Sequence, residues 1–395
     1  MDTPAHQHLR PASASTAALA GVIASATVFG MAQGLSYPLF TFLMQKHGMS
    51  PGEIGLSAAM TPCGMMVSAL LVPFMIRRFG AGRFAIGCAL TAASLFVSIG
   101  VMQNNIAWYP VRFLLGAAVN PLYILGEVWM IALSPPEKRG RFMGVFNALT
   151  GAGFAVGPLS LALVGTDGWP PLFVGIGGFA GCAVLLAFTT RRLAGFEDGE
   201  PAKGVMYFWR VAPALLIAVI VSAAIQQSSY SLLPVFGAFY GIAEATLAGL
   251  ITMMSVGNIV LQLPLGLLAE RFSARAMMVA CASVSMAGAL LLPWLVTTPL
   301  VWPLLLIMGG VGYGIYTMTL VELGNRFSGS TLVAGNAAFG LMWGIGGIAG
   351  APVAGLAMQT VGPVGLPAVM AALTALLVGF ALYRALTRNR AEAGA

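Results

Sequence analysis

The two halves of this chain repeat one another, and the repeat limits the folds that the chain can adopt. A set of residues in the first half returns, in order and in type, 193 positions later. The members are Gln33, Ser36, Tyr37, Gly48, Gly64, Arg78 and Phe79, which return as Gln226, Ser229, Tyr230, Gly241, Gly257, Arg271 and Phe272. Glu127 returns as Glu322 after 195 positions. An apolar chain with such a duplication is typical of membrane transporters, in which two similar helix bundles surround one central site.

The composition favours the same class of protein. Hydrophobic residues make up 58% of the 395 residues, charged residues 8%, and the mean hydropathy is +0.90. A soluble domain carries roughly 25% charged residues. Because a membrane helix needs about 20 apolar residues, the chain has room for twelve. We therefore predict an all-α integral membrane protein with twelve transmembrane helices in two pseudo-symmetric six-helix bundles.

The apolar stretches give the boundaries of these helices. The expected spans are 17–43, 54–76, 84–102, 106–133, 142–164, 171–190, 211–236, 246–269, 276–296, 301–323, 332–358 and 364–384. The first is too long for a signal-peptide core and is expected to stay uncleaved. The expected division is a cytoplasmic tail (1–16), a first bundle (17–190), a plain cytoplasmic linker (191–210), a second bundle (211–384) and a cytoplasmic tail (385–395).

The positions of the basic residues orient this layout. With a cytoplasmic N-terminus, all but two of the 19 Lys and Arg residues lie in inner segments, the exceptions being Lys46 and Arg112. Basic loops stay on the inner side of a membrane, so both termini are expected to be cytoplasmic in a multi-pass protein of the cell membrane, most simply a bacterial inner membrane. The net charge of +7 then reflects membrane topology and does not indicate nucleic acid.

Other chemistries find no support in the residue pattern. The four cysteines lie inside apolar stretches without metal or disulfide spacing, and the histidines form no ligand set. No nucleotide loop follows a predicted strand. We expect no enzyme activity, no metal, no cofactor and a monomer whose partners are a small solute, protons and the lipid bilayer.

Ionisable residues within the spans are the first candidates for function, because burying charge in a bilayer is costly. The fourth span carries a polar stripe at helical spacing, made of Arg112, Gly116, Asn120, Tyr123 and Glu127. The stripe must line a cavity or another helix. Arg112 and Glu127 are candidates for proton coupling, and Asn120 and Tyr123 for substrate binding. The alternative is that these groups only join helices.

The second half offers a weaker counterpart. In the tenth span Tyr316, Thr319 and Glu322 lie on one face, which makes Tyr316 a candidate for substrate binding and Glu322 a candidate for proton coupling. Glu322 also precedes Arg326 by four residues, so an ion pair at the membrane interface is the alternative.

The repeated Gln-x-x-Ser-Tyr element marks the first and seventh spans. Its Gln and Tyr side chains share a face and can bind a ligand, so Gln33, Tyr37, Gln226 and Tyr230 are candidate substrate-binding residues. Pro38 and Pro234 are expected to break these helices near the site. The alternative is hydrogen bonding between helices.

Several short motifs make the chain similar to the major facilitator superfamily over its whole length. Residues 266–272 resemble the family's Gly-x-Leu-Ala-Asp-Arg loop after the second span, with Glu270 at the acidic position, whereas the first half has Pro73 and Arg77 in place of the glycine and the aspartate. Residues 112–116 are similar to a fourth-span Arg-x-x-x-Gly motif linked to proton coupling. Residues 153–158 resemble a Gly-x-x-x-Gly-Pro element of drug/proton antiporters, and 135–141 resemble that branch's loop. The resemblance implies gating roles for Arg78, Gly157, Pro158, Glu270 and Arg271.

These observations favour a secondary active transporter that moves a small, amphiphilic organic solute by alternating access, most simply by proton-coupled efflux. One alternative is proton-coupled uptake of a small organic solute. The other, of a different class, is a membrane receptor or scaffold that transports nothing.

Overall fold

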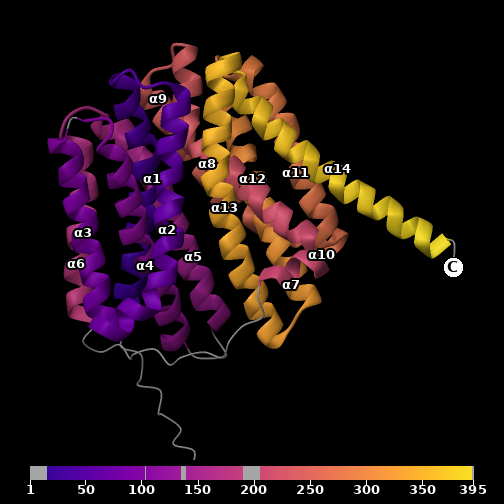
Figure 1. Cartoon of the computed structure of the whole chain (residues 1–395), viewed down its shortest axis with the longest axis horizontal. Helices are drawn as coiled ribbons and strands as arrows, with labels where there is room; N and C mark the ends of the chain where they lie inside the picture. The colour runs from indigo at the N-terminus through magenta and orange to yellow at the C-terminus, as the bar shows by residue number, and fades with distance from the viewer. Residues whose placement is uncertain (1–15, 103, 135–138, 190–204, 394–395) are drawn as a thin grey trace, which may run out of the picture.

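The computed structural model of the protein describes residues 16–102, 104–134, 139–189 and 205–393, and the secondary structure of these residues is helical throughout (Figure 1). The helices of the first half are α1 (Thr16–Lys46), α2 (Pro51–Phe79), α3 (Ala81–Val101), α4 (Trp108–Leu133), α5 (Arg139–Val164) and α6 (Pro170–Thr189). Those of the second half are α7 (Val205–Val211), α8 (Pro213–Phe239), α9 (Glu244–Val260), α10 (Gln262–Phe272), α11 (Ala274–Leu295), α12 (Val301–Arg326), α13 (Gly329–Val361) and α14 (Gly365–Ala393).

Most of these helices can cross a membrane. Among the described residues, 10 helices are long and apolar enough, and the number is 11 if the bent pair α9 and α10 forms one span. Residues Gly365–Ala381 of α14 form a shorter apolar helix. A helix satisfies its own backbone hydrogen bonds, as a segment surrounded by lipid must. The chain therefore folds as a multi-pass helical membrane protein.

The structure adds detail at two of the expected boundaries. The predicted span 246–269 contains a bend of 42° between α9 and α10. Pro264 explains the bend, because its ring lacks an N–H and clashes with the carbonyl group four residues earlier, at Val260, where α9 ends. The predicted plain linker 191–210 also contains a helix, since α7 begins at Val205; residues 191–204 lie outside the described residues.

The prolines beside the repeated element behave differently from Pro264. Helix α1 continues through Pro38, and α8 continues through Pro234. The expected breaks at these positions were therefore wrong. Neighbouring helices surround both segments, and packing of this kind allows a membrane helix to tolerate an internal proline.

The sequence repeat is also a repeat in space. In the first half α1 packs on α4, α5 and α6, α2 packs on α4, and α3 packs on α4 and α6. In the second half α8 packs on α12, α13 and α14, α9 packs on α12, and α11 packs on α12 and α14. Each helix pair of the first half thus has its counterpart in the second. Between the halves, α2 packs on α13, and α5 packs on α9 in the corresponding way.

Close glycine contacts follow the same repeat. A methyl group added to Gly64 of α2 would overlap the carbonyl oxygen of Phe113 in α4. A shift of 193 positions gives Gly257 of α9, which lies in the same way against Leu306 of α12. The reverse contacts match as well, Gly116 with Thr61 and Gly309 with Met254. Small residues at these points let the helix backbones approach closely, so the repeated glycines set the packing of both halves.

The contacts between the two halves gather toward one end of the molecule, which we call the Lys46 end because α1 ends there. Thr41 Oγ1 donates a 2.7 Å hydrogen bond to the carbonyl oxygen of Ser231 in α8. Gln227 Nε2 of α8 donates to the carbonyl oxygen of Ala58 in α2 at 3.2 Å. The opposite end, where α2 ends, is called the Phe79 end; the side chains of Leu70 and Phe74 on the way to it are exposed.

At the Lys46 end an ion cluster joins the halves. Lys46 Nζ lies 2.6 Å from Asp167 Oδ1 in the turn before α6 and 3.0 Å from Glu244 Oε2 at the start of α9. Thr166 accepts a 2.8 Å hydrogen bond from Lys46 Nζ and donates one to Glu244. We call these four residues the Lys46 cluster. Glu244 belongs to the second half and the other three to the first, so the cluster holds the two halves together.

Candidate functional site

Arg112 lies inside the first half and does not face the second half. Its side chain is 1% exposed, and its guanidinium carbon lies 4.8 Å from the centre of the Phe40 ring of α1. Nη1 donates a 3.5 Å hydrogen bond to Ser57 Oγ of α2, whereas Nε and Nη2 have no hydrogen-bond partner among the residues that the structure describes. A buried guanidinium with so few partners is costly, so Arg112 is a candidate for function that the structure leaves open.

The middle of the polar stripe on α4 packs on α2. Gly116 lies against the backbone of Thr61. Asn120 Nδ2 donates to the carbonyl oxygen of Met65 at 2.9 Å and to Ser68 Oγ at 3.2 Å. These bonds use both amide hydrogens of Asn120, so this candidate substrate-binding residue joins two helices in the arrangement seen here.

The last two residues of the stripe, Tyr123 and Glu127, lie beyond the contacts of α4 with α2. The Tyr123 ring stacks on Phe29 of α1 at a centroid distance of 5.0 Å, and its hydroxyl group hydrogen-bonds the Glu127 carboxylate. Both side chains are partly exposed. Within the described part of the chain, no basic group forms an ion pair with Glu127.

The second half carries a group of aromatic rings on α12 and α13. The Tyr316 ring meets Trp343 of α13 edge to face at 4.7 Å, and Tyr313 lies 5.5 Å from Tyr316 and 6.0 Å from Trp343. We call the group formed by Phe29, Tyr123, Glu127, Tyr313, Tyr316 and Trp343 the aromatic–acid cluster.

Three members of this cluster were missed in the sequence. Tyr313 precedes Tyr316 by three residues and therefore shares its helix face, a signal that was available. Phe29 and Trp343 lie in spans where apolar residues are everywhere, so periodicity could not distinguish them from other apolar residues. Of the predicted residues, Tyr123 stacks on Phe29, and Tyr316 lies beside Tyr313 and Trp343.

The repeated Gln-x-x-Ser-Tyr elements lie on either side of one ring of α5. Phe154 lies 6.4 Å from Tyr37 of α1 and 4.9 Å from Tyr230 of α8, measured between ring centroids. Both tyrosines are buried. Tyr37 also hydrogen-bonds Gln227, the neighbour of the repeated Gln226. A cluster of aromatic side chains therefore links the halves at the middle of the molecule.

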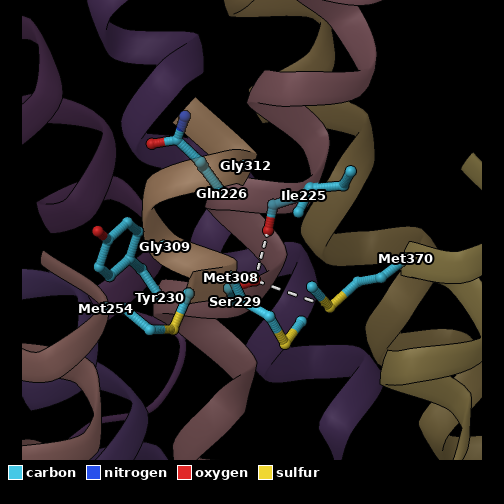
Figure 2. Close-up of a pocket in the computed structure, with 9 residues that line it drawn as sticks. All are labelled: Ile225, Gln226, Ser229, Tyr230, Met254, Met308, Gly309, Gly312 and Met370. Atoms are coloured by element: carbon cyan, nitrogen blue, oxygen red, sulfur yellow. Dashed lines mark hydrogen bonds between the residues drawn. The ribbon is translucent and has the colours of Figure 1, made fainter. Parts of the chain in front are cut away.

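The two glutamines of the repeated elements have different surroundings. Gln33 is buried, and its Nε2 lies 3.8 Å from the sulfur of Met65. Gln226 lines a small pocket within the second half, together with Tyr230, Ser229, three methionines, two glycines and Ile225 (Figure 2). Gln226 Nε2 is buried, and no described residue forms a hydrogen bond with it. Ser229 Oγ donates to the carbonyl oxygen of Ile225 at 2.7 Å, on its own helix.

Glu322 differs from Glu127 in its partners. Its Oε1 lies 2.6 Å from Arg275 Nε of α11 and 2.6 Å from Arg326 Nε. The i,i+4 ion pair considered for this residue is therefore present, and a second arginine reinforces it. Two arginines hold Glu322 at the Phe79 end, whereas no cation of the described segments pairs with Glu127.

The residues given gating roles lie in two places. Arg78, Glu270 and Arg271 are exposed near the Phe79 end. Gly157 and Pro158 lie in α5, where Gly157 packs on the backbone of α1 at Leu35 and Gly34. This α1–α5 contact matches the packing of α8 on α13 in the second half.

The comparison with known protein families identifies the chain. The model of the Major Facilitator Superfamily matches residues 22–329 and 215–395. The chain belongs to this superfamily. Its curated relatives include an uncharacterized transporter of this type from Bacillus subtilis, YfkF, which is 24% identical over 350 residues, covering 85% of this chain and 87% of the relative. YcaD from an Escherichia coli strain is 23% identical over 328 residues, covering 80% and 82%.

Solved structures of transporters share the fold. The nucleoside transporter NupG superposes with a TM-score of 0.76 at 13% identity, over 93% of this chain and 98% of that one. A bacterial homolog of the human lysosomal transporter Spinster, in an inward-facing and occupied conformation, gives a TM-score of 0.73 at 14% identity, over 94% and 96%. The relatives and structural neighbours are transporters, and this superfamily member is a membrane transport protein and not an enzyme.

Proposed function

We propose that this protein is a proton-coupled secondary transporter that exports a small, amphiphilic organic solute by alternating access. The observation that carries the proposal is the aromatic–acid cluster, which combines an acid that has no ion-pair partner among the described residues with stacked aromatic rings on helices of both halves. An ionisable side chain at membrane depth is a functional candidate by default, and aromatic rings provide a surface for an amphiphilic solute.

The proposed architecture has twelve spans in two six-helix bundles, 17–190 and 211–384. It counts α9 and α10 as one bent span and the apolar part of α14 as another. The matched helix pairs support this division. Both termini and the 191–210 connection are then cytoplasmic, and the Lys46 end faces outward.

The arrangement of the halves fits an inward-facing state under this orientation. The Lys46 cluster and the hydrogen bonds from Thr41 and Gln227 join the halves on the outer side. Alternating access requires these contacts to separate when the transporter opens outward. They would form the outer gate.

Glu127 is the proposed proton carrier. Glu322, the other candidate, is neutralised by Arg275 and Arg326 in this state, so releasing it for protonation would require two ion pairs to break. Arg112 lies 15 positions before Glu127, roughly 22 Å along the helix, and would act through the position of α4 against α1 and α2. The solute pathway would continue from the cluster toward the Lys46 end along the two repeated elements, at Gln33, Tyr37, Gln226 and Tyr230.

A solute screen in two stages tests this function. Purified protein is melted in the presence of amphiphilic organic solutes, and each solute that raises the melting temperature is tested in proteoliposomes with an imposed pH gradient. We expect accumulation that a protonophore abolishes. Flux in the direction of the proton gradient would instead support the uptake alternative, and stabilising solutes that are never transported would support a receptor.

The orientation gives a separate prediction. Alkaline phosphatase is active only outside the cytoplasm, so fusions at residue 395 and before residue 1 are expected to be inactive, whereas a fusion in the turn after α1 is expected to be active. Green fluorescent protein fusions at the same sites, which fluoresce in the cytoplasm, serve as controls. Phosphatase activity at either terminus would contradict the layout.

Loss of the Lys46 cluster is expected to favour opening of the Lys46 end. Its side chains are 31%, 39% and 85% exposed for Lys46, Glu244 and Asp167, so solvent screens the attraction, and the cluster contributes up to about 1 kcal/mol. Lys46→Gln should therefore raise the outward-open population by up to about five-fold.

Spin labels at Gln45 and Ala245, in a background without the native cysteines, report this opening as a longer distance. Lys46→Arg keeps the charge and is the control. An unchanged distance distribution in Lys46→Gln would show that the cluster does not hold the gate.

A further inference from the structure

We propose that the groove between α2 and α13 at the Lys46 end binds a phospholipid whose headgroup carries a primary ammonium group, as that of phosphatidylethanolamine does. The groove has a volume of about 580 Å³, within the range of ordinary ligand pockets. None of its described lining residues belongs to the aromatic–acid cluster. The inference therefore goes beyond the proposed transport function and does not depend on it.

The groove follows from a close approach of α2 and α13, which lie side by side (Figure 1). Methyl groups added to Gly55 of α2 and Gly355 of α13 would overlap the carbonyl oxygens of Ala351 and Pro51, respectively. The two helix backbones therefore touch at this level. Gly52, about one turn nearer the Lys46 end, has no side chain, and the groove opens beside it.

The walls of the groove are polar at the end of the molecule and apolar further in. Glu53 of α2 and Gln359 of α13 line it and are exposed near the ends of their helices. Leu56 and Leu356 line it three positions deeper on each helix, roughly 4.5 Å further into the membrane, and are 50% and 56% exposed. A phospholipid has the same order, with a polar head at the membrane interface and apolar chains beneath it.

The carboxylate of Glu53 determines the charge of the headgroup. Its Oε2 accepts hydrogen bonds from the backbone N–H of Ser50 at 2.8 Å and from the Ser50 hydroxyl group at 2.7 Å, so the ionised carboxylate completes the cap of α2. No described residue forms a hydrogen bond or an ion pair with Oε1. Lys46, the nearest basic residue in the sequence, is paired with Asp167 and Glu244. A cation in the groove would therefore supply the missing countercharge.

Gln359 distinguishes a primary ammonium group from other headgroups. An –NH₃⁺ group carries three N–H donors, so it can donate to Glu53 Oε1 and to the amide oxygen of Gln359 on the opposite wall. The quaternary ammonium of a choline headgroup has the same charge and no N–H donor. A glycerol headgroup leaves the lipid anionic, and its phosphate would meet Glu53 without an ammonium group to offset the repulsion.

A competition among three lipids tests this site. The full-length protein is freed of native lipid in detergent and mixed with equal amounts of palmitoyl-oleoyl lipids that carry ethanolamine, choline or glycerol headgroups, and the bound lipids are resolved by native mass spectrometry. Because Glu53 is exposed, solvent screens its attraction for the ammonium group. We therefore expect the ethanolamine lipid to bind about three- to five-fold more often than either competitor.

Two variants separate Glu53 from the general charge of the Lys46 end. Glu53→Gln removes the charge and keeps the size of the side chain, so the three lipids should then bind equally. Asp167→Asn removes a carboxylate at the same end but outside the groove, and it should leave the preference unchanged.

A second pair of variants tests the apolar part of the groove and guards against misfolding. Leu356→Trp fills the groove without changing its charge and should abolish the preference for the ethanolamine lipid. Leu290→Trp makes the same change on α11, where Leu290 is 57% exposed, and should preserve the preference. The melting curves must match that of the parent protein, and Leu56→Trp replaces Leu356→Trp if the latter is destabilised.

Three results would overturn the proposal. Equal binding of the three lipids by the parent protein, or a preference that Glu53→Gln leaves intact, would show that the groove does not select the lipid. Equal binding of the ethanolamine and choline lipids would contradict the primary ammonium group. A dimer that Leu356→Trp dissociates would show that a second copy of the chain covers the groove. None of these measurements involves transport, so failure of the lipid site is distinguishable from failure of the proposed function.

Discussion

Glu127→Gln is expected to abolish solute movement driven by a proton gradient while leaving solute exchange intact. The amide resembles the protonated acid but can neither bind nor release a proton. Net flux in proteoliposomes should fall to the level of protein-free liposomes, whereas exchange of labelled for unlabelled solute across the membrane should continue, because exchange needs only the reorientation of a loaded carrier. The hydrogen bond with Tyr123 can survive the change, so the fold should be preserved.

Two controls sharpen this experiment. Glu53→Gln makes the same chemical change at an exposed helix start and should retain full gradient-driven flux. Tyr123→Phe removes the hydroxyl group that holds Glu127 and should slow flux without abolishing it. Full uncoupler-sensitive flux in both Glu127→Gln and Glu322→Gln would show that neither acid carries the proton.

Gly64→Val is expected to destabilise the protein strongly. The nearest atom to the added side chain is the carbonyl oxygen of Phe113, a backbone atom that cannot move unless α4 moves with it. Overpacking of this kind costs about 1–3 kcal/mol, and more where backbone must shift. Gly257→Val should have a similar effect, because Gly257 lies against Leu306 in the same geometry.

Thermal melting in detergent measures both variants. Gly87→Val is the matched control, because Gly87 is also a helical glycine but has nothing within 4 Å of the added carbon. It should change the stability by less than about 0.5 kcal/mol. If Gly64→Val has the same melting temperature as Gly87→Val, the close approach of α2 and α4 does not limit stability.

The fold could be predicted from the sequence where hydrophobicity alone determines it. Length, apolar stretches and the repeat predicted a helical membrane protein, and Gly64 and Gly257 were already members of the repeat. The bend at Val260 was missed although Pro264 was visible, because prolines elsewhere in this chain leave their helices intact. Whether a proline bends a membrane helix depends on the helices packed around it. The local sequence does not say which helices these are.

The site was harder to predict, for a related reason. The spacing on α4 gave the correct helix face, but that face is divided among several neighbouring helices. Asn120 bonds to α2, and Arg112 lies among α1, α2 and α4, whereas Tyr123 stacks on Phe29 of α1. Periodicity says which residues share a face. Which helix that face meets along its length is a property of the tertiary packing.

The unequal pairing of the two repeated acids has a consequence for the energetics of transport. Two arginines neutralise Glu322, whereas no basic group of the described residues pairs with Glu127, so under the proposed mechanism one carboxylate, Glu127, carries one proton in each cycle. One proton exchanged for one monovalent cation moves no net charge across the membrane. Transport of such a solute would then respond to the pH difference and be indifferent to the membrane voltage, whereas exchange of a neutral solute for a proton would generate a current.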